Sequence, residues 1–178
     1  MEARGLRLFF ALPLPPVARV VLEDWRRELP PLGGWSASEG LHLTLAFLGQ
    51  RPAEALPGLE ALGATVAARH AAFDLDTTAL GAFSGGAHTR LLWLGLAPAP
   101  ALEALAGDLC GALAAAGEAF DPKPFRAHIT LARFRQAQRL DAFRNPPPQR
   151  FPADRLVLFE SRSQGRYTPL RDWNLRRV

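Results

Sequence analysis

Residues 41–45 have the sequence LHLTL, and residues 127–131 have the sequence AHITL. Each copy alternates apolar residues with a histidine and a threonine, which is the period of a half-buried β-strand. On such a strand His42 and Thr44 point to one face, while the apolar residues point to the opposite face and into a core. The second copy follows the same rule, so the sequence predicts two equivalent strands that carry the same polar pair.

The two copies together indicate acid–base chemistry. The chain has four histidines, and two of them, His42 and His128, precede a hydroxyl residue, Thr44 or Thr130, by the same spacing. One such phrase alone is more often a surface or core feature. If the two strands lie side by side, however, they offer two imidazoles and two hydroxyls to one site. That set suits proton transfer at a phosphate and stabilisation of its charge without a metal.

Length and composition predict one globular domain over residues 1–178, with 48% hydrophobic residues to fill a core. No apolar run approaches the roughly 18 residues of a membrane span, and the charged start does not fit a signal peptide. The single Cys110 excludes an internal disulfide and fits the cytoplasm. We therefore expect a cytoplasmic monomer without membrane association.

Charge and ligand spacing limit the possible partners. The net charge of +4 suits a polyanion, although the abundance of Arg, Ala, Pro and Gly equally fits a biased genome composition. No His or Cys spacing matches a zinc site. We expect neither a metal nor another cofactor.

The hydrophobic pattern predicts strands that alternate with helices. The first helix is expected to present Val17, Val20, Val21 and Trp25 as its apolar face. The expected helices cover residues 15–29, 54–69, 100–116 and, as a short turn, 140–143. The expected strands cover residues 6–12, 35–37, the segment around His42, 73–83, 90–95, 125–134, 155–161 and 167–175. This order predicts an α+β domain of two similar lobes. Each lobe would be a small antiparallel sheet with helices on its outer face, and the two motif strands would meet in a groove between the sheets.

The paired motifs resemble those of the 2H phosphoesterase superfamily, and more closely the RNA 2′,3′-cyclic phosphodiesterases, also called LigT-like or 2′-5′ RNA ligase family proteins. Residues 41–49 resemble the first family motif, and residues 124–133 resemble the second. The resemblance covers nearly the whole chain and implies the same two-lobed fold. The sequence departs from the family at Ala127 and Ser84, where proline is frequent, and neither change removes a chemical group.

The resemblance implies an enzyme that hydrolyses the 2′,3′-cyclic phosphate ends of RNA, or small cyclic nucleotides, to 2′-phosphates. It assigns His128 as the base that activates water and His42 as the acid that protonates the leaving 3′-oxygen. The hydroxyls of Thr44 and Thr130 would donate to the phosphate oxygens.

Three further residues are candidates for substrate binding. Phe47 and Arg133 each lie five residues after a motif histidine, an odd offset that places them on the opposite face of a regular strand. In the family the aromatic residue stacks on a base and the arginine lies near base or phosphate. Both could reach the site only if each strand ends or bulges after its threonine. Arg126 shares the strand face of His128 and is a weaker candidate, because a solvated edge residue explains it equally well.

Two alternatives remain open. The same residues could perform the reverse reaction, 2′-5′ RNA ligation, and the sequence does not separate the two directions. A non-catalytic module that binds RNA ends or nucleotides is the other alternative. The presence of both complete His-x-Thr phrases argues against it.

Overall fold

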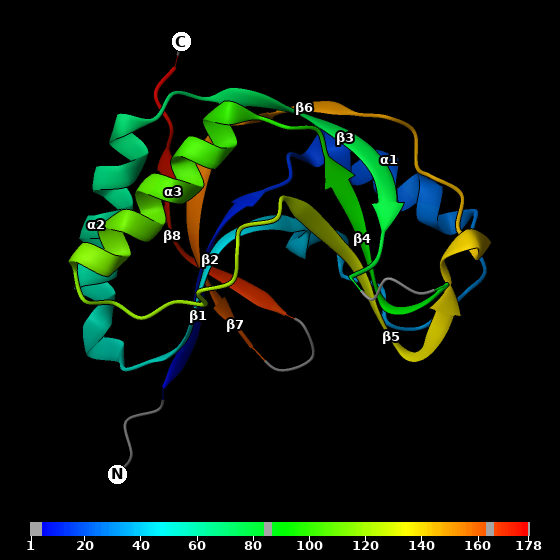
Figure 1. The fold of residues 1–178 in the computed structure, drawn as a ribbon, viewed down its shortest axis with the longest axis horizontal. Coiled ribbons are helices and arrows are strands. Elements are labelled where there is room, and N and C mark those ends of the chain that lie inside the picture. Colours follow the sequence, from blue (N-terminus) through cyan, green and yellow to red (C-terminus); the bar gives the residue numbers. More distant parts are fainter. Residues whose placement is uncertain (1–4, 84–86, 163–165, 178) are drawn as a thin grey trace.

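The computed structural model of the chain describes residues 5–83, 87–162 and 166–177, so Ser84 lies outside the described residues. Two four-stranded antiparallel sheets form the molecule, and helices lie outside them (Figure 1). Among the described residues, no helix is long and apolar enough to cross a membrane. The α+β architecture of two small antiparallel sheets confirms the predicted fold class.

The first sheet has the strand order β2-β1-β7-β8 and joins the two ends of the chain. Its strands are β1 (Leu6–Pro13), β2 (His42–Arg51), β7 (Arg155–Ser161) and β8 (Tyr167–Asn174). The first motif therefore lies on an edge strand. The hairpin β7–β8 was expected, but its place beside β1 follows only from the tertiary structure.

The second sheet has the order β5-β4-β3-β6, so the second motif also lies on an edge strand. Its strands are β3 (Phe73–Gly81), β4 (His88–Leu96), β5 (His128–Arg139) and β6 (Arg150–Ala153). The sequence analysis missed β6, because four residues with a proline among them give too short a pattern to distinguish. The strand expected at 35–37 is only an isolated bridge between Trp35 and Ala132.

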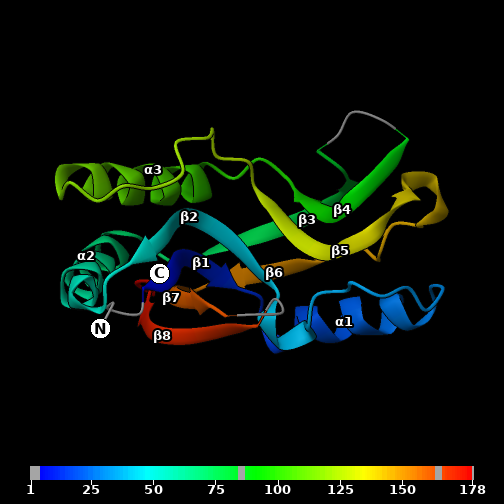
Figure 2. The same ribbon diagram turned by 90° about the horizontal axis from the view of Figure 1, so that it is seen from below.

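In the described part of the chain three α-helices cover the sheets, and each has a proline in its first turn, where no backbone hydrogen bond is lost. They are α1 (Pro16–Arg27), α2 (Leu56–Arg69) and α3 (Pro100–Ala115). Helices α2 and α3 lie together beside the first sheet, while α1 lies at the opposite end, beside the second (Figure 2). Short 3₁₀ turns occupy Ser38–Gly40, Ala53–Ala55 and Leu140–Ala142.

The predicted apolar face of α1 was wrong in part. Val17 and Val20 are 66% and 58% exposed, whereas Ala18, Leu22 and Trp25 are buried. The buried residues recur at i, i+4 and i+7, which is the spacing of residues on one face of a helix. The two valines lie outside this face. Trp25 fixes this orientation, since its indole N–H donates to the Arg144 carbonyl oxygen at 3.1 Å.

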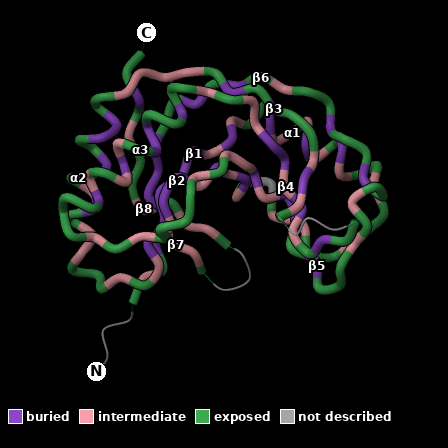
Figure 3. Tube along the Cα trace, viewed as in Figure 1, coloured by how far each residue is buried: buried purple, intermediate pink, exposed green. Residues whose placement is uncertain are grey.

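The core has two parts that occupy opposite faces of the first sheet. Leu8, Phe10 and Leu12 of β1 belong to a large cluster that includes residues of both sheets and of the helices. Phe9 and Ala11 belong to a smaller cluster with Val157 and Phe159 of β7. Figure 3 shows buried segments in purple on both the strands and the helices. The smaller cluster lies on the same face as the first motif histidine and forms part of its surroundings.

Candidate active site

The two motif strands are held together by the segments that precede them. Strands β2 and β5 are in contact. The Arg133 N–H on β5 donates to the Gly34 carbonyl oxygen at 2.8 Å, and the Asp121 N–H donates to the Phe47 carbonyl oxygen on β2 at 2.8 Å. Each lobe thus sends the residues before its own motif strand to the edge of the other motif strand. Gly34, with φ of 99°, is required at this contact, because a Cβ there would collide with the Arg133 carbonyl group.

Both motif histidines are anchored in the same way. The Nδ1–H of His42 donates to the Gly40 carbonyl oxygen at 2.6 Å, and the Nδ1–H of His128 donates to the Arg126 carbonyl oxygen at 2.7 Å. Because a carbonyl oxygen only accepts, Nδ1 must carry the proton in both rings. In each neutral imidazole Nε2 is therefore the unprotonated nitrogen, which can accept a proton. The Nε2 of His42 lies 3.1 Å from the Thr44 hydroxyl oxygen.

Aromatic rings surround His42 on the first sheet. Phe9 of β1 and Tyr167 of β8 approach its imidazole with ring centroids 4.9 and 4.8 Å away, and Phe159 of β7 lies at 5.9 Å. The Tyr167 ring also packs so closely against Gly40 that a Cβ there would lie 3.1 Å from it. These contacts fix the plane of the imidazole and exclude water from its faces. The sequence analysis did not single out these rings, because β1, β7 and β8 are all remote in sequence from His42.

His128 has different neighbours on the second sheet. Phe83 lies edge-to-face against its imidazole with centroids 4.9 Å apart, and Trp93 of β4 lies 6.2 Å away. Trp93 is paired with Thr130 across β4 and β5, so it shares the face of the motif side chains. The Thr130 carbonyl oxygen accepts a hydrogen bond from the Ser36 hydroxyl at 3.2 Å, which fixes the strand at this point.

Burial lowers the pKa of both imidazoles below the ordinary 6.5. For His42 the positive charges of His128 and Arg133 lower the pKa further, and for His128 the charge of Arg133 does so. The anchoring carbonyl groups act in the opposite direction in both cases. The two histidines and Arg133 therefore share one electrostatic environment, although the histidines come from separate sheets.

A β-bulge at the same place in each motif brings Phe47 and Arg133 to the histidine face. In β2, Thr44 is opposite Ala11 and Ala46 is opposite Phe10, so that Leu45 is the extra residue. The chain then returns to alternation with its faces exchanged. Phe47 is consequently opposite Phe9, on the side that carries His42.

The second motif repeats this geometry. Thr130 is opposite Trp93 and Ala132 is opposite Leu92, which makes Leu131 the extra residue. Arg133 then lies opposite Leu91, on the face of Trp93 and Thr130. The bulge that both candidates required is present in both strands. Their roles in binding substrate remain predictions.

Two candidate substrate-binding residues, Phe47 and Arg126, have different contacts near the motif histidines. Phe47 stacks on Phe9 at 6.5 Å, and the Arg7 guanidinium lies 4.9 Å from the centre of its ring. Arg126 is exposed and supplies its backbone carbonyl oxygen to His128. Its contribution in this structure therefore comes from the main chain.

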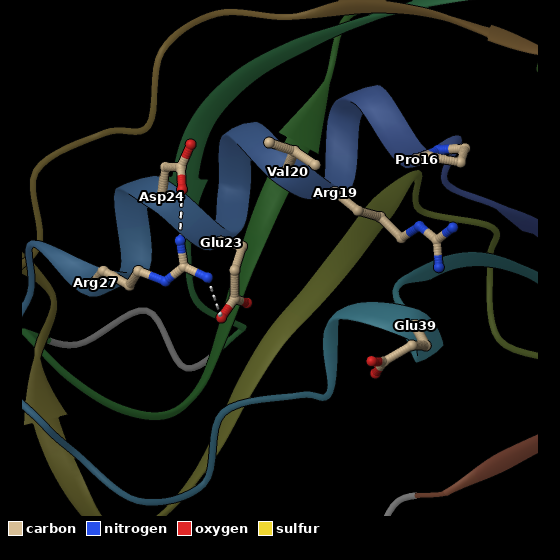
Figure 4. A pocket seen from close by; sticks show the side chains of 7 residues that line it. All are labelled: Pro16, Arg19, Val20, Glu23, Asp24, Arg27 and Glu39. Carbon is tan, nitrogen blue, oxygen red and sulfur yellow. Dashed lines mark hydrogen bonds and ion pairs between the residues drawn. The ribbon is translucent and has the colours of Figure 1, made fainter.

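A surface pocket lies elsewhere, along the exposed side of α1, with Glu39 opposite the helix (Figure 4). Arg27 in this pocket is paired with Asp24 at 2.8 Å and with Glu23 at 3.9 Å. None of the predicted site residues lines it. Across the described residues, no group of three or more His, Cys, Asp or Glu side chains is arranged to hold a metal ion.

The chain also resembles known proteins over most of its length. Residues 13–165, which contain both motifs, match the model of the 2′-5′ RNA ligase superfamily. The chain belongs to this superfamily. It is 35% identical to the RNA 2′,3′-cyclic phosphodiesterase of Escherichia coli (strain K12), over 95% of this chain and 96% of that protein. It is 37% identical to the protein of the same name from Thermus thermophilus, over 72% of this chain and 68% of that one.

Solved structures of the superfamily have the same fold. The crystal structure of E. coli LigT complexed with 3′-AMP superposes with a TM-score of 0.78 at 35% identity, and the match covers 97% of this chain and 99% of that chain. The superfamily fold thus accounts for both sheets and for the hairpin β7–β8 that completes the first. The two bulged motif strands lie on the edges of these sheets.

Proposed function

We propose that the protein is an RNA 2′,3′-cyclic phosphodiesterase that hydrolyses cyclic phosphate ends, or small cyclic nucleotides, to 2′-phosphates. One observation carries the proposal. Two histidines on equivalent bulged strands are each held by Nδ1, which leaves both Nε2 atoms for proton transfer, and one arginine acts on both. The named relatives from E. coli and T. thermophilus support the same substrate class.

The reaction requires one proton to be removed and one to be supplied. His128 Nε2 takes a proton from water as the water oxygen attacks phosphorus. The bond from phosphorus to the 3′-oxygen breaks, and His42 Nε2 gives its proton to that oxygen. The product is the 2′-phosphate with a free 3′-hydroxyl. The two imidazoles end with exchanged protonation states and re-equilibrate with solvent.

The surroundings of the two histidines support this division of roles. His42 is enclosed by three aromatic rings, whereas His128 lies beside Phe83, whose side chain is 46% exposed. A nucleophile from solvent reaches the more open side more readily. Burial lowers the pKa of both imidazoles and so favours their neutral forms. The anionic cyclic phosphate supplies the charge that favours protonation of His42.

The neighbouring groups complete the binding of the phosphate. The Thr44 and Thr130 hydroxyls donate to the non-bridging oxygens, and Arg133 neutralises the charge that develops on them. Phe47 offers an aromatic surface to the terminal base, since every base has a π-face. The Arg126 side chain has at most a minor role in attracting the RNA backbone.

The experiment is to incubate the purified protein and excess EDTA with a short RNA that ends in a 2′,3′-cyclic phosphate, and then to identify the product isomer. We expect complete conversion to the 2′-phosphate, unaffected by the chelator, because two imidazoles provide both proton transfers. The His42→Ala/His128→Ala double variant is the control for contaminating nucleases. A 3′-phosphate product, or loss of activity in EDTA, would contradict the proposal. Size-exclusion chromatography and cell fractionation test the expected monomeric state and cytoplasmic location.

A further inference from the structure

Arg7 lies beside Phe47 on the first sheet and has no acidic partner among the described residues. Its side chain is exposed, and its guanidinium carbon lies 4.9 Å from the centre of the Phe47 ring. Within the described part of the chain, this ring contact is the one interaction of the guanidinium. By contrast, Arg139, which is also exposed, is paired with Asp141 at 3.0 Å. A guanidinium that is held only by an aromatic ring keeps its N–H donors for an anion.

The register of β1 and β2 places Arg7 on the face that carries the first motif histidine. Phe9 is opposite Phe47, and Arg7 precedes Phe9 by two residues, so the two side chains of β1 point to the same side. The Phe9 ring lies 4.9 Å from the His42 imidazole and 6.5 Å from the Phe47 ring, measured between centroids. This face therefore carries a row that begins at His42, continues through two aromatic rings and ends at a cation.

The spacing within this row suits one nucleotide. Thr44, which would bind the cyclic phosphate, is opposite Ala11, and Phe47 is opposite Phe9. Ala11 and Phe9 are two residues apart, which is roughly 7 Å along a strand. Because the Arg7 guanidinium lies over Phe47, it is displaced along the sheet from the phosphate site by about this distance. Consecutive phosphates of an extended RNA strand have a similar separation.

We propose that Arg7 binds the phosphodiester on the 5′ side of the terminal nucleotide, so that the enzyme prefers RNA ends to cyclic mononucleotides with a free 5′-hydroxyl. This inference rests on the proposed function, in which the terminal base stacks on Phe47. Because a base and its 5′-phosphate are joined to one ribose, the phosphate that leads upstream lies within reach of the same ring. The planar guanidinium can donate two N–H groups to two phosphate oxygens.

Arg135 on β5 is the alternative contact for upstream RNA. It lies two residues after Arg133, is exposed, and forms no ion pair with a described residue. However, β5 belongs to the second sheet, whereas Arg7 and Phe47 are on the first. Among the described residues, Arg7 is the arginine whose guanidinium lies over the Phe47 ring. The position of the terminal base therefore favours Arg7.

The test compares the hydrolysis of two substrates that differ only in a 5′-phosphodiester. One is adenosine 2′,3′-cyclic phosphate, and the other carries a methyl phosphate ester on its 5′-oxygen, which adds one negative charge but no second base. We expect the wild-type kcat/KM to be about tenfold or more higher for the diester, because charge-assisted hydrogen bonds from arginine to phosphate are strong. This preference should decrease as the salt concentration rises.

The variants separate the charge of Arg7 from its packing on Phe47. Arg7→Met keeps an apolar cover over the ring but removes the charge, and it should bring the ratio of the two kcat/KM values close to one. Arg7→Lys keeps the charge without the planar fork and should retain part of the preference. Arg139→Met is the matched control, since it removes an exposed arginine that is paired with Asp141 on the second sheet. It should leave the ratio unchanged.

Two results would overturn the inference. One is a wild-type protein that hydrolyses both substrates with equal kcat/KM, which would reject this inference alone, whereas failure to hydrolyse either substrate would reject the proposed function. The other is an Arg7→Met variant that keeps the wild-type ratio. If that variant lost activity on both substrates equally, Arg7 would be only a cover for Phe47. If Arg135→Met lowered the ratio instead, the upstream phosphate would lie on the second sheet.

Discussion

In β2 the motif histidine lies among aromatic rings, whereas in β5 it lies beside an arginine and a partly exposed aromatic pair. The backbones of the two strands are nevertheless alike. Both lie on sheet edges, both hold Nδ1 of the histidine on the carbonyl oxygen two residues earlier, and both bulge after the threonine. Their fifth residue after the histidine differs, being Phe47 in one strand and Arg133 in the other.

The comparison shows that backbone geometry and chemical role are set separately. The repeated motif supplies two imidazoles that are anchored in the same way, and the packing around each imidazole makes their surroundings unequal. Burial by Phe9, Phe159 and Tyr167 lowers the pKa of His42 and so favours its neutral form, whereas a bound anion would favour its charged form. The openness beside His128 favours access of a nucleophile.

Removal of either histidine should cause the largest loss of activity of all the substitutions considered. We expect His42→Ala and His128→Ala each to reduce kcat by about 10² to 10⁴, because each removes one proton transfer. The double variant should lose little more than the worse single variant, since the two act as a unit. Single-turnover assays with a cyclic phosphate RNA measure this, and full activity in either variant would reject the paired mechanism.

Replacement of Arg133 tests whether the difference at the fifth position matters. Arg133→Ala should reduce kcat by about 10² to 10³, the usual loss when a group that stabilises developing charge is removed. Phe47→Ala should act mainly through KM. Kinetics at two salt concentrations should also show a weaker salt dependence for Arg133→Ala. An equal effect of both substitutions on kcat would contradict the assigned difference.

The pH dependence reports how the two histidines are coupled. One must be protonated and the other neutral, so kcat/KM should follow a bell with its optimum below pH 6.5, because burial lowers both pKa values from that ordinary value. Arg133 lowers both pKa values further. In Arg133→Ala both limbs of the profile should therefore move to higher pH. Limbs that stay in place would show that this charge does not act on the pair.

The two threonines allow a finer comparison. Thr44→Val and Thr130→Val keep the β-branched shape but lose the hydroxyl, which should cost about 1–3 kcal/mol of transition-state stabilisation. Because the Thr44 hydroxyl is also near His42 Nε2, only Thr44→Val should in addition move the pH profile. Rates and pH profiles of both variants measure this. If Thr130→Val turns over normally at saturation but binds poorly, its hydroxyl is a docking group.

Arg126→Ala should have the smallest effect, within about threefold on a cyclic mononucleotide, as is usual for an exposed side chain without a buried partner. The His128 anchor is the backbone carbonyl of this residue, and alanine retains it. Steady-state kinetics with the mononucleotide provide the measurement. A loss comparable to that of Arg133→Ala would show that the side chain contacts the phosphate.

Much of the fold could be predicted because strand and helix periods are local. The alternation around His42 and His128 predicted the strand faces, and the repeat predicted two equivalent lobes. The limits of this reasoning appear at α1, where Val17 and Val20 looked as apolar as the residues that are buried. Only the packing of Trp25 decided which face turned inward. Likewise, β6 is too short to be recognised without β3 beside it.

The sequence by itself determined the chemical inventory: two histidines and two threonines on matching strands, and an aromatic and a basic residue at equivalent offsets. Only the tertiary structure decided that both offsets reach the histidine face, because a bulge at Leu45 or Leu131 is defined by the register with a neighbouring strand. It also decided which side chains surround each imidazole, since Phe159, Tyr167 and Phe83 reach the motifs through long-range strand pairing and packing. Local periodicity is encoded within a few residues, whereas register and burial are properties of segments that meet only when the chain folds.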